Sequence, residues 1–215
     1  MKNITGVELN ENSIFERAIA FATAAHAGAK RKGTGIPYIV HPIEAAAIAS
    51  TMTTDEEMLA AAVLHDVLED TDTEPEELER LFGSRVLKLV QNESENKRKD
   101  LPAHETWKIR KQETITFLKE HADKEAKMLA LADKLSNMRA IYRDSQILGD
   151  ELWQRFNQKD KCMHAWMYRA IAEALQDLSE YMVWHEYNWL IDATFGNKCD
   201  NCGNSCNCFL KKRTK

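Results

Sequence analysis

Signals for helices recur along this chain, and signals for strands are nearly absent. Ser13 and Glu16 form a capping-box pattern, and apolar residues follow it at the spacing of one helical face. Similar patterns predict helices over residues 43–52, 54–70, 73–83, 105–121, 124–143 and 152–191, with Thr54 and Thr73 opening two of them. Glycines between residues 28 and 37 predict a loop. The chain is therefore expected to fold as an all-α helical bundle.

The composition of the chain changes once, after Gly196. Residues 1–196 are expected to form one domain, because they contain no linker-like segment and no internal repeat. Residues 197–215 form a Cys-rich tail, with cysteines at Cys199, Cys202, Cys206 and Cys208. Four thiolates can bind zinc or an iron–sulfur cluster, although these are closer together than in most structural zinc sites. A second metal site and a reduced, flexible tail are both compatible with this pattern.

The charge and hydropathy of the chain exclude some classes of partner. The formal net charge is -5, which argues against a general attraction to nucleic acid. No apolar run approaches the roughly 20 residues that span a bilayer, and the N-terminus lacks the apolar stretch of a secretory signal. We therefore expect a cytoplasmic protein with a small-molecule substrate and neither a membrane nor a nucleic-acid partner. A homo-oligomer remains open.

Four ionisable groups share one face of the helix predicted over residues 54–70. At about 100° per residue, His65, Asp66, Glu69 and Asp70 fall within a sector of roughly 140°. Burying three carboxylates together is costly unless a positive charge lies among them, and a divalent cation is the simplest source. The alternative is a solvated acidic helix end before the turn that follows Asp70.

Two further polar residues stand in apolar surroundings. Asp133 interrupts the apolar run of residues 128–132, where a bare carboxylate is rare. It binds either a metal ion or a basic neighbour, Lys134 or Arg139. His41 lies between apolar residues 38–40 and Pro42, and alone it would more often be a satisfied core histidine. Only the combination with the other groups makes it a candidate ligand.

Together these residues have the chemistry of a metal-dependent hydrolase. His41, His65, Asp66 and Asp133 offer mixed imidazole and carboxylate ligands, which suit Mn²⁺, Fe²⁺ or Zn²⁺. Such an ion lowers the pKa of bound water and supplies a nucleophile near neutral pH. Glu69 and Asp70 would then orient that water, take its proton or protonate the leaving group.

Basic residues suggest an anionic substrate. Arg31 and Lys32 lie in the glycine-flanked loop, where two cations can meet phosphates or stack on a base. Lys161 and Tyr168 belong to a basic and aromatic string that could contact a nucleotide, although aromatics at helical spacing are more often core. A second basic group could extend the anion site, but we favour a solvated helix face for it: Lys97, Lys108, Arg110 and Lys111.

Four motifs of the chain resemble the HD-domain hydrolases of the RelA/SpoT type. They are Arg-Lys at residues 31–32, Pro-Tyr-Ile-Val-His-Pro at 37–42, His-Asp-x-x-Glu-Asp-Thr at 65–71 and Leu-Ala-Asp-Lys-Leu-x-Asn-Met-Arg at 131–139. The resemblance covers roughly residues 13–145. It implies an HD-domain helical bundle that removes the 3′-pyrophosphate from the alarmone (p)ppGpp with Mn²⁺. Because about 70 residues follow, it also implies a hydrolase without an appended synthetase domain.

The resemblance assigns roles residue by residue. The metal ligands would be His41, His65, Asp66 and Asp133, the catalytic acids Glu69 and Asp70, and the substrate contacts Arg31, Lys32 and Asn137. The segment over residues 91–97 and the residues Ala29 and Ala140 depart from the alarmone hydrolases. The alternatives are therefore hydrolysis of another nucleotide, such as a dNMP, an adenosine alarmone or a phosphorylated dinucleotide, and a nucleotide sensor that binds without cleaving.

Overall fold

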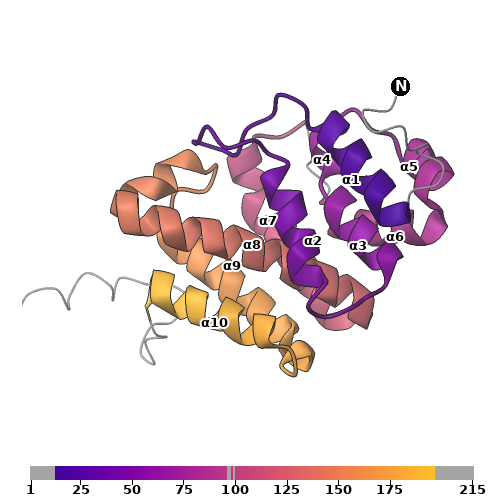
Figure 1. Cartoon of the computed structure of the whole chain (residues 1–215). Coiled ribbons are helices and arrows are strands. Elements are labelled where there is room, and N and C mark those ends of the chain that lie inside the picture. The colour runs from indigo at the N-terminus through magenta and orange to yellow at the C-terminus, as the bar shows by residue number, and fades with distance from the viewer. Residues whose placement is uncertain (1–12, 96–97, 99, 197–215) are drawn as a thin grey trace, which may run out of the picture.

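The fold of the chain, seen in a computed structural model, is all-α, as predicted, and contains no strand within the described residues 13–95, 98 and 100–196 (Figure 1). The helices are α1 (Ile14–Ala25), α2 (Val40–Ala49), α3 (Glu56–Leu64), α4 (Val67–Asp70), α5 (Pro75–Phe82), α6 (Ser84–Glu93), α7 (Ala103–Glu120), α8 (Lys124–Leu148), α9 (Lys161–Ala174) and α10 (Met182–Phe195), with 3-10 turns η2 (Gly149–Arg155) and η3 (Gln176–Leu178). The tail over residues 197–215, with its cysteines, and Lys97 lie outside the described residues. The predicted domain boundary therefore stays a prediction.

The ends of the helices match the predicted capping signals in one case and differ by one or two residues in two others. The capping box of α1 is confirmed, because the Ser13 side chain accepts from the Glu16 N–H and Glu16 reaches back to the Ser13 N–H. The N-cap of α3 is Asp55 rather than Thr54, since the Asp55 carboxylate accepts from the first turn. α5 begins at Pro75 and not at Thr73, because proline suits a first helical turn.

The helix predicted from residue 54 to residue 70 is interrupted, and this prediction was wrong. α3 ends at Leu64, and α4 starts at Val67. Between them, the His65 ring bonds to the carbonyl oxygen of Ala62, and Asp66 adopts φ -97° and ψ -4°. Its own carbonyl then accepts the Asp70 N–H, which opens the short helix. The histidine and aspartate therefore lie in a turn at the centre of the bundle.

Helix α8 forms the centre of the bundle and contacts α2, α3, α6 and α10 (Figure 1). Its fully buried residues include Leu129, Leu131, Leu135 and Met138. Alanines on α2 and α3 are also fully buried and let the helix backbones approach closely. α8 therefore presents Asp133 to the turn between α3 and α4 and to the first turn of α2.

Of the basic residues of α7 for which we favoured a solvated face, Lys108 is exposed as expected, but Arg110 and Lys111 are engaged with an acid. The Glu95 carboxylate bonds to Arg110 at 2.7 Å and to Lys111 at 2.6 Å. The side chains of Glu95 and Arg110 are each only 11% exposed, so the group is a nearly buried ion cluster that fixes the start of the connection between α6 and α7. These two cations are therefore engaged with the protein itself.

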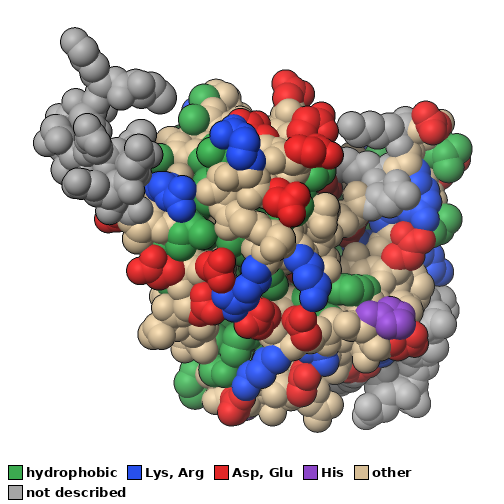
Figure 2. All heavy atoms as spheres, turned by 90° about the vertical axis from the view of Figure 1, so that its right-hand side faces the viewer, with side chains coloured by type: hydrophobic (Ala, Val, Ile, Leu, Met, Phe, Trp, Pro, Cys, Tyr) green, Lys and Arg blue, Asp and Glu red, His purple; other side chains and the backbone are tan. Residues whose placement is uncertain are grey.

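Figure 2 shows Lys and Arg side chains interspersed with Asp and Glu over one face, where hydrophobic side chains form only small separate groups. No described helix combines the length and apolar character needed to cross a bilayer.

Candidate metal centre and adjoining cavity

Four side chains from three parts of the chain meet at the centre of the bundle. His41 comes from the first turn of α2, His65 and Asp66 from the turn after α3, and Asp133 from α8. The His41 and His65 Nε2 atoms are 3.3 Å apart, and Asp133 Oδ1 lies 3.1 Å from the first and 3.6 Å from the second. Asp66 Oδ2 lies 3.5 Å and 3.0 Å from the same two atoms. The four predicted ligands are therefore brought together.

The other ring nitrogen of each histidine determines where its hydrogen lies. His65 Nδ1 lies 2.8 Å from the carbonyl oxygen of Ala62, which can only accept, so Nδ1 donates. His41 Nδ1 lies 2.8 Å from the Ser136 hydroxyl, which donates its own hydrogen to Glu44. In the neutral imidazoles, both Nε2 atoms then present lone pairs to each other and to two carboxylates. This arrangement is repulsive unless a positive charge lies among the groups.

Burial and the carboxylates act in opposite directions on the imidazoles. Burial lowers the pKa of His41 below its usual value, which favours the neutral, metal-binding form. Burial also acts to lower the pKa of His65, but the Asp66 and Asp133 carboxylates outweigh it and raise that pKa well above its usual range. The cluster therefore attracts a positive charge. Its two nitrogen and two oxygen donors fit a divalent transition metal.

The two oxygens of Asp133 have different partners, one a basic neighbour and the other the two histidines. Oδ2 accepts from the Lys134 ammonium, which also lies 3.5 Å from Glu93. Oδ1 faces the two imidazoles. The other suggested partner, Arg139, bonds to residues on α2 and α10 instead. One oxygen of Asp133 is thus held by an ion pair while the other is directed toward the candidate metal.

Tyr38 connects the candidate metal centre to a predicted catalytic acid. Its hydroxyl lies 2.7 Å from Asp66 Oδ2 and 2.9 Å from Asp70 Oδ2. Burial and these carboxylates raise the pKa of Tyr38, so the phenol keeps its hydrogen. Glu69 precedes Asp70 in the single turn of α4 and is less exposed. The sequence pattern assigned Tyr38 no role, although it stands in the run of residues 37–42 that carries His41.

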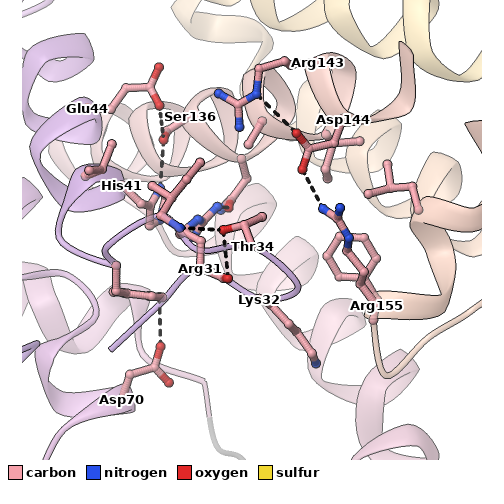
Figure 3. A pocket seen from close by; sticks show the side chains of 18 of the residues that line it. Arg31, Lys32, Thr34, His41, Glu44, Asp70, Ser136, Arg143, Asp144 and Arg155 are labelled. Atoms are coloured by element: carbon pink, nitrogen blue, oxygen red, sulfur yellow. Dashed lines mark hydrogen bonds and ion pairs between the residues drawn. The ribbon is translucent and has the colours of Figure 1, made fainter. Parts of the chain in front are cut away.

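A cavity of about 310 Å³ opens beside the four groups, within the size range of small-molecule sites. Its walls come from the loop between α1 and α2, and from α2, α4, α8, η2 and α9. Figure 3 shows His41 and Asp70 on one side, and Asp144 with Arg155 on the other. The cavity therefore leads from the candidate metal centre to a more basic outer part.

The predicted basic loop forms part of the cavity wall. Arg31 donates to Asn137 Oδ1 at 2.7 Å, and Asn137 donates to Asp133 Oδ1 at 2.6 Å. Lys32 bonds to Asn157 at 3.2 Å. Three predicted substrate residues, Arg31, Lys32 and Asn137, therefore line the cavity, and Arg31 and Asn137 are linked to Asp133 in the candidate metal centre.

The other two predicted substrate residues differ in their placement. Tyr168 lines the cavity but is 95% buried and packs against Tyr187 and Phe195, so it belongs to the core as well. Lys161 is not among the lining residues, and its ammonium bonds to Asp150 at 3.1 Å. The structure does not bring Lys161 to the site.

Gly33 holds the basic loop against η2. Its φ is +70°, and a Cβ there would lie 2.5 Å from the Arg155 side chain. Gly33→Ala is therefore expected to lower the free energy of unfolding by about 1–3 kcal/mol. The matched control is Gly35→Ala, because a Cβ at Gly35 meets nothing within 4 Å. Urea denaturation of both variants measures the difference, and equal loss in both would contradict this account of the loop.

Comparison with known families and relatives supports one family. The HD domain family matches residues 18–156 of the chain. A guanosine-3′,5′-bis(diphosphate) 3′-pyrophosphohydrolase MESH1 of Danio rerio is 38% identical over 137 residues, which cover 62% of this chain and 72% of that protein. An Aquifex aeolicus protein with the same enzyme name is 37% identical over 127 residues, but the match covers 59% of this chain and only 18% of that longer protein.

Solved structures show the same architecture. The structure of a metazoan orthologue of SpoT, described as hydrolysing ppGpp, matches with a TM-score of 0.69 and 26% identity, over 86% of this chain and 98% of that one. A Listeria monocytogenes protein matches with a TM-score of 0.64 and 27% identity, over 73% of this chain and 99% of that one. The similarity therefore extends beyond the matched motifs to the arrangement of the helices.

Proposed function

Because the chain belongs to the HD domain family, we propose that it is a divalent-metal-dependent hydrolase that removes the 3′-pyrophosphate of ppGpp. The observation that carries this proposal is the position of the convergent donors. Ligand atoms of His41, His65 and Asp133 lie within 4.8 Å of one another, and His41 also lines the basic cavity. The names of the relatives from Danio rerio and Aquifex aeolicus agree with this substrate.

Mn²⁺ is the metal that we propose for the site, with His41, His65, Asp66 and Asp133 as its ligands. These imidazole and carboxylate donors are compatible with Mn²⁺. When bound, the ion would supply Lewis-acid chemistry and lower the pKa of water. The bonds from Nδ1 of each histidine hold the rings so that the Nε2 atoms remain directed at the ion.

The acid pair handles protons in this proposal. Water attacks the phosphorus attached to the ribose 3′ oxygen, the bond between them breaks, and pyrophosphate leaves. The attacking water must lose a proton and the 3′ oxygen must gain one. Asp70 lines the cavity and is held by Tyr38, and Glu69 lies beside it in the same turn. We assign these proton transfers to the two carboxylates.

The basic outer part of the cavity supports a substrate with phosphates at both ends. The 3′-pyrophosphate would lie near the candidate metal, with Arg31 beside it. The nucleoside and its 5′-diphosphate would extend toward Lys32, Arg143 and Arg155. Asp144 bonds to both outer arginines and orients them along the cavity wall, as Figure 3 shows. Guanidinium groups bind phosphates well because their planar N–H donors match two oxygens.

The proposal predicts turnover of ppGpp by the Mn²⁺-loaded protein, with GDP and pyrophosphate released in equal amounts. Chromatography of the nucleotide and an enzymatic pyrophosphate assay measure the two products. A parallel panel contains a dNMP, an adenosine alarmone and a phosphorylated dinucleotide. Cleavage of one of these alone would remove ppGpp as the substrate but keep the hydrolase. Tight ppGpp binding with no product from a single turnover would instead identify a nucleotide sensor.

A further inference from the structure

A chain of hydrogen bonds leads from the predicted metal ligand His41 to a carboxylate on the same helix. His41 Nδ1 lies 2.8 Å from Ser136 Oγ, and Ser136 Oγ lies 2.8 Å from Glu44 Oε2. Figure 3 shows the three side chains in a line along one wall of the cavity. Ser136 is only 1% exposed, so water does not compete for its hydroxyl. The sequence patterns gave Ser136 and Glu44 no role.

The direction of the hydrogen bonds along this chain is fixed by chemistry. The hydroxyl of Ser136 has one hydrogen, and the carboxylate of Glu44 can only accept it. The hydroxyl oxygen must then accept from His41 Nδ1–H. This leaves His41 Nε2 without a hydrogen in the neutral ring, directed toward His65 and Asp133. Ser136 and Glu44 thus select the tautomer in which Nε2 is the ligand atom.

Glu44 is itself held in place by Arg139 of α8, which is anchored in turn by α10. Its second oxygen accepts from Arg139 at 3.2 Å. Arg139 in turn makes a two-point contact with Glu186 on α10, at 2.6 Å and 2.8 Å. Such paired contacts restrict the guanidinium to one orientation. The carboxylate that orients Ser136 is therefore anchored by α8 and α10.

We propose that Ser136 and Glu44 are positioning residues that set the tautomer and direction of His41 for metal binding. This inference rests on the proposed metal site, but it concerns two residues that are not among the four proposed ligands and that act on the metal through His41. Groups that hold a histidine ligand through its other nitrogen typically affect metal affinity by about 10–100-fold. The expected effect is therefore on Mn²⁺ affinity and not on the fold.

The first test measures Mn²⁺ affinity of the full chain by competition with a fluorescent chelator. Ser136→Ala is expected to weaken Mn²⁺ binding at least about tenfold. The matched control is Ser145→Ala on the same helix, because the Ser145 hydroxyl bonds to the backbone carbonyl of Tyr142 and to Gln146 rather than to a histidine. It should keep the wild-type affinity. Melting temperatures of the metal-free proteins show whether each variant is folded.

The second test separates positioning from a general structural role. Glu44→Ala is expected to weaken Mn²⁺ binding as well, whereas Glu44→Gln, which keeps an acceptor oxygen, should restore part of the affinity. In a variant that carries both Ser136→Ala and Glu44→Ala, the two losses of Mn²⁺ affinity should not add, because both residues act through the same hydrogen bond to His41. Nitrogen-15 NMR of the metal-free protein should show His41 with its hydrogen on Nδ1 in the wild type, and a mixture of tautomers in Ser136→Ala.

The outcomes distinguish this inference from the proposed function. If the wild type binds no Mn²⁺, the proposed metal site fails. If the wild type binds Mn²⁺ and Ser136→Ala binds it equally well, only the positioning role fails. Additive losses in the double variant, or an unchanged tautomer in Ser136→Ala, would also overturn that role. Should Ser136→Ala not fold, the Glu44 variants decide the question, because Glu44 is partly exposed.

Discussion

Asp133→Asn is expected to abolish Mn²⁺ binding and, with it, hydrolysis. The side chain is 7% exposed, and its Oδ1 atom lies 3.1 Å and 3.6 Å from the two imidazole nitrogens. Asparagine keeps the shape but removes the negative charge that the cation needs. It also leaves the Lys134 ammonium without its nearest anion. We expect Mn²⁺ affinity to fall by more than about 100-fold. This exceeds the effect of losing a group that only holds a metal ligand in place.

Two measurements check this expectation. Elemental analysis gives the bound Mn²⁺, and a thermal shift follows the stabilisation that a tightly bound ion gives, about 4 kcal/mol at 1,000 times its Kd. The control is Asp144→Asn, which changes a carboxylate on the same helix that pairs with Arg155 rather than with the imidazoles. It should keep Mn²⁺. Full metal content in Asp133→Asn would contradict the ligand assignment.

Glu69→Gln and Asp70→Asn are each expected to lower kcat for ppGpp by about 10²–10⁴-fold, the usual contribution of a general acid or base. Both variants should keep Mn²⁺, because neither side chain is one of the four convergent groups. Asp70 lines the cavity and bonds to Tyr38, so Asp70→Asn also replaces a charged acceptor of that phenol by a neutral one. Single-turnover kinetics with the metal content measured in parallel test both statements.

A nearby acid provides the control for this experiment. Asp72 is exposed in the turn after α4 and is not among the residues that line the cavity. Asp72→Asn should therefore retain wild-type turnover. If Glu69→Gln and Asp70→Asn both react within threefold of wild type, the proton transfers must be assigned to other groups. Loss of Mn²⁺ in either variant would instead show that the acid pair belongs to the metal site.

Local signals predicted most of the helices because helical periodicity and capping depend on neighbouring residues. The box at Ser13 and Glu16 is an example, as is the apolar run of α8. The break at His65 and Asp66 was not predictable in this way. It depends on a hydrogen bond from the His65 ring to the carbonyl oxygen of Ala62 and on packing against the surrounding core. The apolar pattern of the sequence continues through the turn at His65 and Asp66, so it does not indicate the break between α3 and α4.

The candidate ligands were predictable because each places a polar group among apolar residues. Tyr38, Ser136 and Glu44 gave no comparable signal, since a tyrosine in a loop and a serine or glutamate within a helix are common. Their importance appears only in distances between helices that are far apart in sequence. For the same reason, periodicity could not show that Lys161 bonds to Asp150 or that Arg110 binds Glu95.

The basic loop between α1 and α2 has a consequence for how the protein matures. Arg31 bonds to a residue 106 positions later in the chain, and Lys32 to one 125 positions later. Closing such long loops costs conformational entropy that only the packed bundle offsets. While the chain is being synthesised, the predicted metal ligands His41, His65 and Asp66 emerge early. Arg31 and Lys32 find their hydrogen-bond partners only after Asn137 and Asn157 have been synthesised. The contacts that hold Arg31 and Lys32 in the cavity wall are therefore expected to form late in folding, because each joins segments far apart in the chain.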